Sequence, residues 1–84
     1  MIYVYVLHST ADDQLYTGCT RDLRARFEIH NAGKVPSTRD RRPLELIYYE
    51  ACLNEQDAFR REKYLKTTYG KRYIKIRCKN YFTV

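Results

Sequence analysis

The hydrophobic and polar residues near the start of the chain follow the pattern of a β-hairpin. Residues 2–9 alternate with a period of two, and both faces are apolar or aromatic, which predicts a central strand. Residues 10–13 contain two adjacent aspartates, which favour a turn, and residues 14–20 predict a second strand. The side chains that then share one face of the sheet are Tyr5, Leu7, Tyr16 and Gly18.

A helical pattern follows the hairpin. Residues 20–22 offer side chains for an N-cap, and Gly33 is suited to end the helix. The spacing i, i+3, i+4 and i+7 places one set of side chains on a single helix face: Leu23, Arg26, Phe27 and His30. Residues 34–43 then predict a basic loop with a proline near each end.

The second half of the chain predicts one more strand and two more helices. Residues 44–51 predict a third strand, and Asn54 predicts the cap of a helix that runs to about Tyr69. Gly70 is expected to break that helix, and a short basic helix over residues 71–79 is expected to follow, with final residues that fold back or fray. The order β-β-α-β-α-α predicts an α/β domain of the α+β kind, with a three-stranded, mainly antiparallel sheet flanked by helices.

The composition is that of one small globular domain. With 84 residues the chain has room for one small core, so we expect a single domain over residues 1–84. No apolar run approaches the ~20 residues that span a membrane, and the start lacks the features of a signal peptide, so we expect a cytoplasmic protein. The spacing of Cys19, Cys52 and Cys78 lacks a Cys-x-x-Cys zinc motif and favours small buried thiols.

The positive charge is concentrated in one segment. The net charge is +6, and residues 60–79 carry nine bases and one acid, which is +8 and leaves −2 for the remainder. A basic segment on a nearly neutral body is typical of a protein that binds a polyanion such as nucleic acid. The alternative is a solvated helix face that aids solubility.

Tyr5, Tyr16, Arg26 and His30 are the first candidates for chemistry. The two tyrosines can equally be cross-strand packing partners, and a phenol, with a pKa near 10, needs a nearby cation or metal to act as a base. Arg26 and His30 lie one turn apart on an otherwise apolar helix face. Each alone can be explained by the structure, Arg26 reaching the rim and His30 as a partly buried imidazole. Together, beside the tyrosines, they predict a functional cluster.

Glu62 is the other candidate, because it is the one acid in the basic segment and falls on the apolar side of its predicted helix. Its partner at i+4 is Lys66, so a salt bridge is one explanation. The other is a metal ligand. A single carboxylate suits Mg²⁺, which keeps most of its waters.

Four segments of the chain resemble the GIY-YIG nuclease superfamily. They are Tyr3-Val4-Tyr5, Tyr16-Thr17-Gly18, the Asp-Leu-x-x-Arg…His pattern of residues 22–30, and Arg60-Arg61-Glu62-Lys63. The resemblance covers roughly residues 2–67 and is strongest to small stand-alone bacterial members, which are related to the N-terminal domain of the excinuclease C subunit. Tyr3 and Thr17 depart from the family's glycine and isoleucine.

The resemblance implies a role for each candidate residue. The residue at Tyr5 would be the general base or would orient the attacking water, and Tyr16 would assist it. Arg26 would stabilise the scissile phosphate, and His30 would hydrogen-bond within the tyrosine and water network. Glu62 would hold one divalent cation, Mg²⁺ or Mn²⁺, at the leaving oxygen. A polar residue near the C-terminus often completes such sites, and Asn80 is the candidate here.

The resemblance and the charge together predict a metal-dependent endonuclease that binds DNA. The cations expected to contact phosphates are Arg39, Arg41, Arg42, Arg60, Arg61, Lys63, Lys66, Lys71, Arg72 and Lys75. Because no motif that reads bases is present, we expect structure-guided or weakly sequence-specific cutting, or targeting by a protein partner. The alternatives are a catalytically silent nucleic-acid-binding module on the same scaffold and a protein-interaction domain that binds an acidic partner.

Overall fold

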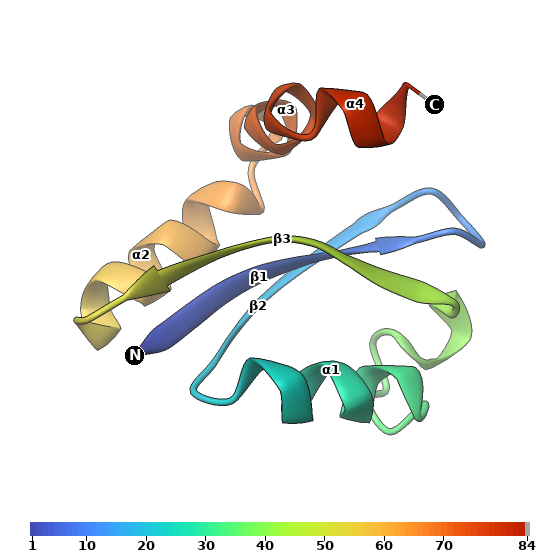
Figure 1. The fold of residues 1–84 in the computed structure, drawn as a ribbon, viewed down its shortest axis with the longest axis horizontal. Coiled ribbons are helices and arrows are strands. Elements are labelled where there is room, and N and C mark those ends of the chain that lie inside the picture. The colour runs from blue at the N-terminus through green and yellow to red at the C-terminus, as the bar shows by residue number, and fades with distance from the viewer. Residues whose placement is uncertain (84) are drawn as a thin grey trace.

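The computed structural model describes residues 1–83 as a three-stranded antiparallel sheet with helices on both faces (Figure 1). The strands are β1 (Ile2–Ser9), β2 (Leu15–Thr20) and β3 (Leu44–Cys52), in the spatial order β2-β1-β3. The helices are α1 (Leu23–Asn31), α2 (Glu55–Leu65), α3 (Thr68–Arg77) and α4 (Lys79–Phe82), with a 3₁₀ turn η1 (Arg39–Arg41) before β3. This α+β fold confirms the predicted class and order, in which β1 is the central strand.

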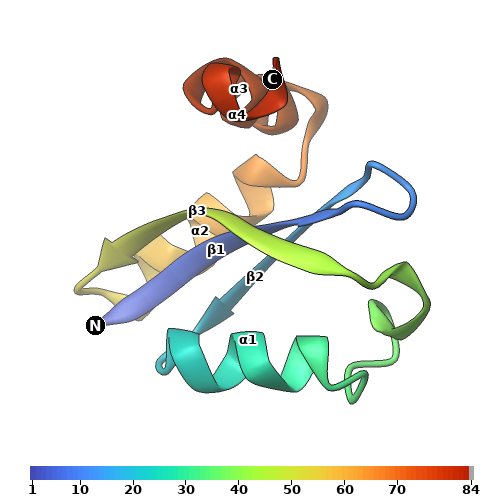
Figure 2. The same ribbon diagram turned by 45° about the vertical axis from the view of Figure 1, so that its right-hand side comes forward.

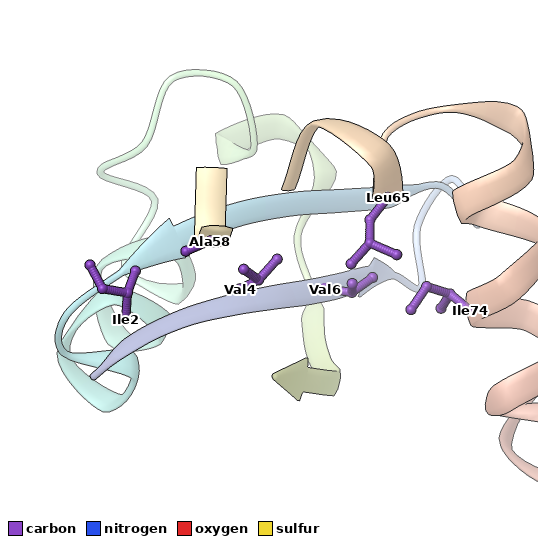
Figure 3. Close-up of a cluster of buried hydrophobic side chains, with 6 residues drawn as sticks. All are labelled: Ile2, Val4, Val6, Ala58, Leu65 and Ile74. Carbon is purple, nitrogen blue, oxygen red and sulfur yellow. The ribbon is translucent and has the colours of Figure 1, made fainter. Parts of the chain in front are cut away.

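The helices divide between the two faces of the sheet. Figures 1 and 2 both show α1 below the sheet and α3 and α4 above it. Residues of α2 and α3 share one core cluster with β1, which places α2 on the same face as α3. One core cluster joins β1 to the helices above and consists of Ile2, Val4, Val6, Ala58, Leu65 and Ile74 (Figure 3). The opposite cluster joins the sheet to α1 and consists of Tyr5, Leu7 and Leu44, with Tyr16, Leu23, Phe27 and Leu46 packed against it.

The local signals in the sequence account for the hairpin and for α1. Leu7 pairs with Tyr16 and Tyr5 with Gly18, which confirms that these four residues share one face of the sheet. The Asp22 side chain accepts a hydrogen bond from the Ala25 amide at 3.1 Å and caps α1. Gly33 follows α1 with a φ of +76°, the left-handed conformation that a glycine adopts without strain.

The predicted boundary after α2 is wrong by several residues. The helix starts at its Asn54 cap as expected but ends at Leu65, and Thr67 caps α3 by accepting a hydrogen bond from the Gly70 amide at 3.1 Å. Gly70 therefore lies inside the first turn of α3 and does not break a helix. Gly70 lets the backbone of α3 approach that of α2, because a Cβ atom there would collide with the carbonyl oxygen of Tyr64 in α2.

The C-terminal residues fold back onto the sheet. In α4, Tyr81 shares a 2.7 Å hydrogen bond with Nδ1 of His8 and donates another of 2.7 Å to Glu45, and Phe82 packs edge-on against His8. The other ring nitrogen of His8 bonds Asp13 at 2.6 Å. These contacts attach α4 to the far end of β1 and β3. Among residues 1–83, every helix is too short or too polar to cross a membrane.

Candidate active site

Tyr5 begins the site, because its ring crosses from the central strand over the edge strand. Tyr5 of β1 pairs with Gly18 of β2, and a Cβ atom added to Gly18 would lie 2.5 Å from the Tyr5 hydroxyl oxygen. Any side chain at position 18 would occupy the space of the ring. Glycine therefore allows the Tyr5 hydroxyl to reach across β2 on the face that α1 covers.

Two side chains of α1 bind the Tyr5 hydroxyl. Nε2 of His30 lies 3.0 Å from it, and Nε of Arg26 donates a longer hydrogen bond of 3.4 Å. The helical spacing of Arg26 and His30 places them one above the other, as the sequence predicts. His30 and Tyr5 are almost completely buried, whereas Arg26 is partly exposed. Arg26 is thus the member of this group that reaches the surface.

Tyr16 completes the aromatic part of the cluster. Its ring centroid lies 5.1 Å from that of His30 and 6.4 Å from that of Tyr5. Tyr16 is partly exposed, so it stands between the buried hydrogen bonds and the solvent. The structure therefore brings together Tyr5, Tyr16, Arg26 and His30, the four residues that the sequence grouped.

Burial and charge set the protonation of the cluster. Burial is the main cause that raises the pKa of Tyr5, outweighing the hydrogen bond from Arg26, so the phenol is protonated at neutral pH. Burial, and then the charge of Arg26, lower the pKa of His30, so its imidazole is neutral. The hydrogen bond to Tyr5 raises the pKa of Arg26, and Tyr16 acts in the same direction. The guanidinium is the cluster's permanent cation.

Thr38 is a buried member of the cluster that no pattern in the sequence indicates. Its Oγ1 lies 2.8 Å from Nδ1 of His30, and its side chain is fully buried just before η1. A threonine in a polar, proline-containing loop gives no periodic signal. Its position depends on a turn of the loop, in which the Thr38 amide donates to the carbonyl of the buried Val35 at 3.1 Å.

Glu62 lies on the other side of the sheet, in α2. Its carboxylate forms an ion pair of 3.0 Å with Lys66, and its side chain is 23% exposed. The pKa of Cys19 in β2 is raised to about 12, mainly by burial and then by the neighbouring Glu62. The Glu62 carboxylate therefore lies beside the edge strand β2. Among the described residues, Glu62 makes no hydrogen bond to the Tyr5 cluster, although its charge contributes to raising the Tyr5 pKa.

The donor set around Glu62 fits a hard cation that needs few protein ligands. Within residues 1–83, no group of three or more histidines, cysteines or acids stands close enough to enclose a metal. A lone carboxylate beside a nucleic acid is the setting in which Mg²⁺ takes its remaining ligands from phosphate and water. Lys66, which is largely exposed, would have to leave the carboxylate first.

Several of the predicted phosphate-binding cations have protein partners. Arg61 forms a bidentate pair with Glu50, Arg41 pairs with Asp12 at 3.1 Å, and Arg60 pairs with Asp57 at 3.4 Å. Arg42 instead donates to backbone carbonyls of Arg39 and Asn31. Asn80, the C-terminal candidate, is exposed in α4, on the face of the sheet opposite α1 (Figure 2).

The exposed cations of α3 form a separate surface. Lys71, Arg72 and Lys75 line a shallow hollow of about 390 Å³ with Thr68 and Ile76, and we call these three cations the basic surface of α3. This helix packs on α2, above the sheet in Figure 1. The basic surface and Glu62 are thus carried by neighbouring helices, while the Tyr5 cluster lies beneath the sheet.

Comparison with known proteins agrees with this geometry. Residues 1–75 match the model of the GIY-YIG catalytic domain. A UPF0213 protein of Staphylococcus haemolyticus is 44% identical over 66 residues, which cover 77% of this chain and 79% of the relative. A UPF0213 protein of Clostridium perfringens is 43% identical over 67 residues, which cover 79% and 71%. The search of solved structures found no match.

The family model spans both tyrosine segments, all of α1 and all of α2. It therefore includes the Tyr5 cluster and Glu62, on both sides of the sheet. The relatives, which are named only as UPF0213 proteins, add no activity of their own. The chain belongs to the GIY-YIG family, whose catalytic domain implies a nuclease, a hydrolase of nucleic acids.

Proposed function

We propose that this protein is a metal-dependent endonuclease that hydrolyses phosphodiester bonds in DNA. The observation that carries the proposal is the hydrogen-bonded group in which Arg26 and His30 converge on the Tyr5 hydroxyl. A structural core does not need a charged guanidinium and a neutral imidazole on one buried phenol. Acting on DNA, the protein would work in the cytoplasm.

Arg26 would bind the scissile phosphate. Its Nε is used by Tyr5, so the two terminal amino groups of the guanidinium can donate to phosphate oxygens. The bond to Tyr5 also limits the rotation of the side chain, so less freedom is lost when the phosphate binds. The charge that accumulates on the phosphate in the transition state would then meet a cation already in place.

Tyr5 and Tyr16 would position the attacking water. Because burial raises its pKa, Tyr5 is a phenol at rest, and it becomes a base only when nearby cations favour its phenolate. Tyr16 is the more exposed of the two and would contact the water or the substrate directly. His30 and Arg26 hold the Tyr5 oxygen in one place during this step.

Glu62 would hold one Mg²⁺ or Mn²⁺. When bound, the ion supplies positive charge that neutralises the leaving oxygen. The chain's own contribution is the carboxylate, which is held beside β2 and partly buried. Lys66 keeps this carboxylate paired while no ion is present.

DNA binding would depend on phosphate contacts. Lys63 and the basic surface of α3 are exposed and would bind the phosphates of the DNA backbone. Such contacts give affinity without sequence preference. Arg39 of the loop is exposed as well. Specificity would then come from the shape of the DNA or from a protein partner.

The test is a cleavage assay with Mg²⁺ or Mn²⁺ on single strands, duplexes, flaps and junctions, with chelator as the negative control. We expect metal-dependent nicking or cutting of at least one substrate. Arg26→Ala at equal purity should be inactive, which excludes a contaminating nuclease. Absence of cleavage on every substrate would refute the proposal, and full activity of the variant would remove Arg26 from the site.

One observation favours a second candidate, the silent nucleic-acid-binding module. Glu62 is already satisfied by Lys66 at 3.0 Å, so its position can be explained without a metal. On this reading the protein binds DNA, does not cleave it, and binds no tighter with Mg²⁺ than without it.

A further inference from the structure

A hydrogen-bonded chain of three side chains runs inward from the site. It connects the Tyr5 hydroxyl, both ring nitrogens of His30 and the hydroxyl of Thr38, at 3.0 Å and 2.8 Å. All three residues are at most 2% exposed. The family resemblance gives no role to Thr38, which lies at the buried end of the chain.

Counting protons distinguishes the two forms of His30. The neutral ring carries one N–H, on Nδ1 or on Nε2. If Nδ1 carries it, His30 donates to Thr38, and the buried Thr38 hydroxyl proton has no acceptor, because its one partner among residues 1–83 is His30. If Nε2 carries it, Thr38 donates to His30, and His30 donates to Tyr5. The second form satisfies the buried Thr38 donor, and a buried donor without an acceptor is costly. The unmatched proton is then that of the Tyr5 phenol, at the end of the chain beside the partly exposed Arg26 and Tyr16, where water or substrate can accept it.

We propose that Thr38 is a positioning residue that fixes His30 as the Nε2–H tautomer. The Tyr5 oxygen then accepts two hydrogen bonds, one from His30 and one from Arg26. Two donors stabilise the phenolate more than the phenol, so Thr38 assists the ionisation of Tyr5 without touching the substrate. This inference rests on the proposed nuclease function for its role, but the hydrogen-bond order can be tested without DNA.

The ionisation of Tyr5 depends on groups from three elements, and a test must hold the others constant. The groups that influence it are Tyr16 of β2, Arg26 and His30 of α1, and Glu62 of α2. Thr38→Val removes the hydroxyl at nearly constant volume and leaves all four of these residues in the chain, so the expected change is confined to the tautomer of His30. Thr38→Ser keeps the hydroxyl and is the matched control.

The first experiment is ¹⁵N NMR of the histidine rings, with His30→Gln to assign the signals. We expect the Nε2–H tautomer of His30 in the wild type and in Thr38→Ser, and a mixed or inverted tautomer in Thr38→Val. A ¹³Cζ-tyrosine titration should show Tyr5 ionising about one unit higher in Thr38→Val, the size expected for one lost hydrogen bond. An Nδ1–H tautomer in the wild type, or an unchanged tautomer in Thr38→Val, would overturn the assignment.

The second experiment is the pH profile of DNA cleavage. The rising limb should move to higher pH in Thr38→Val and return in Thr38→Ser, whereas a purely structural loss would lower the rate at every pH. A changed tautomer with an unchanged profile would overturn the positioning role. If no form of the protein cleaves DNA, the nuclease function fails, and the NMR result still decides whether Thr38 sets the tautomer.

Discussion

The ring of Tyr5 lies directly over Gly18, and the two residues stand opposite each other on adjacent strands. Gly18 has no positive φ, since Gly33 is the one glycine with that conformation. The motif Tyr16-Thr17-Gly18 therefore needs its glycine because the Tyr5 ring fills the space of a side chain, and not because of a special backbone conformation. The motif supplies both a phenol and the opening through which the other phenol reaches the site.

Gly18→Ala should displace the Tyr5 ring and break its hydrogen bonds. The added Cβ would be 2.5 Å from the hydroxyl oxygen and 2.6 Å from the ring carbon that carries it. We expect a loss of about 1–3 kcal/mol in the free energy of unfolding, as for other overpacked cores, and a loss of cleavage comparable to that of Tyr5→Phe. Chemical denaturation and the cleavage assay measure the two effects.

A double-mutant cycle separates this clash from other effects of the alanine. In a Tyr5→Ala background there is no ring to collide with, so Gly18→Ala should cost little stability. An equal cost in both backgrounds would show that the glycine matters for another reason.

Glu62→Gln should separate chemistry from stability. The Glu62–Lys66 pair is an i, i+4 pair on a partly exposed helix face, and such pairs contribute about 0–1 kcal/mol. We therefore expect little change in the melting temperature, largely intact DNA binding and a fall in cleavage of at least about 10²-fold, the size seen when one stabilising group is removed from a transition state. Glu28→Gln, at an exposed carboxylate of α1, is the control of equal charge.

Melts with and without Mg²⁺ add a readout that does not depend on activity. Stabilisation by Mg²⁺ in the presence of a DNA that the protein cannot cleave should be smaller in Glu62→Gln than in Glu28→Gln. A Glu62→Gln variant that is destabilised but active would refute the metal-ligand assignment.

DNA affinity should fall steeply with salt. Each phosphate neutralised on duplex DNA contributes a slope of about −0.9 to the plot of log affinity against log salt. Reversal of the basic surface of α3, by Lys71→Glu, Arg72→Glu and Lys75→Glu, should flatten the plot and leave the fold intact, because all three side chains are exposed. Binding isotherms at several salt concentrations measure the slope.

The control for this variant reverses Arg24 and Lys34, which are exposed cations outside α3. It should change the slope less than the α3 variant does. If the α3 variant keeps the wild-type slope, the DNA surface lies elsewhere, and Arg39→Glu would test the loop over residues 34–43.

Glu50 should make stability depend on acid pH. Burial alone would raise the pKa of Glu50, but hydrogen bonds from Arg61 and Tyr48 outweigh it and hold the pKa below its ordinary value. A carboxyl with a lowered folded pKa stabilises the fold above its unfolded pKa, near 4.3, and loses that contribution as pH falls through the folded pKa. Wild type should therefore lose stability on acidification through this range.

Glu50→Gln lacks this titration and serves as the comparison. Its stability should be lower than that of the wild type at pH 7, because Arg61 loses its bidentate partner, and the difference should shrink as pH falls below 4. Urea denaturation at several pH values, with Glu28→Gln beside it, measures this. A difference that does not vary with pH would show that the pair does not titrate as argued.

The parts of the site that follow local periodicity could be predicted from the sequence. The alternation in β1 and the length of the turn set the register of Tyr5 and Tyr16, and the helical spacing set the common face of Arg26 and His30. These depend on neighbours in the chain, so a pattern of a few residues contains the information.

The parts that depend on tertiary packing could not be predicted. Thr38 reaches His30 because the loop turns after the buried Val35, whose carbonyl accepts the Thr38 amide, and no periodicity indicates this turn. The end of α2 is one such part, because a glycine at position 70 predicts a helix break, whereas packing against Tyr64 requires a glycine inside α3. The sequence leaves the salt bridge and the metal role of Glu62 as alternatives, whereas the structure shows the ion pair with Lys66 at 3.0 Å.

Gly70 has a consequence for motion. It brings the backbone of α3 against the backbone of α2 at Tyr64 and Leu65, and helices in such contact lack the layer of adaptable side chains that lets packed helices slide. Glu62 on α2 and the basic surface on α3 should therefore move as one rigid body. DNA bound by α3 would therefore stay at a constant distance from the Glu62 carboxylate. The phosphates that α3 binds would then also determine which phosphodiester bond is cut.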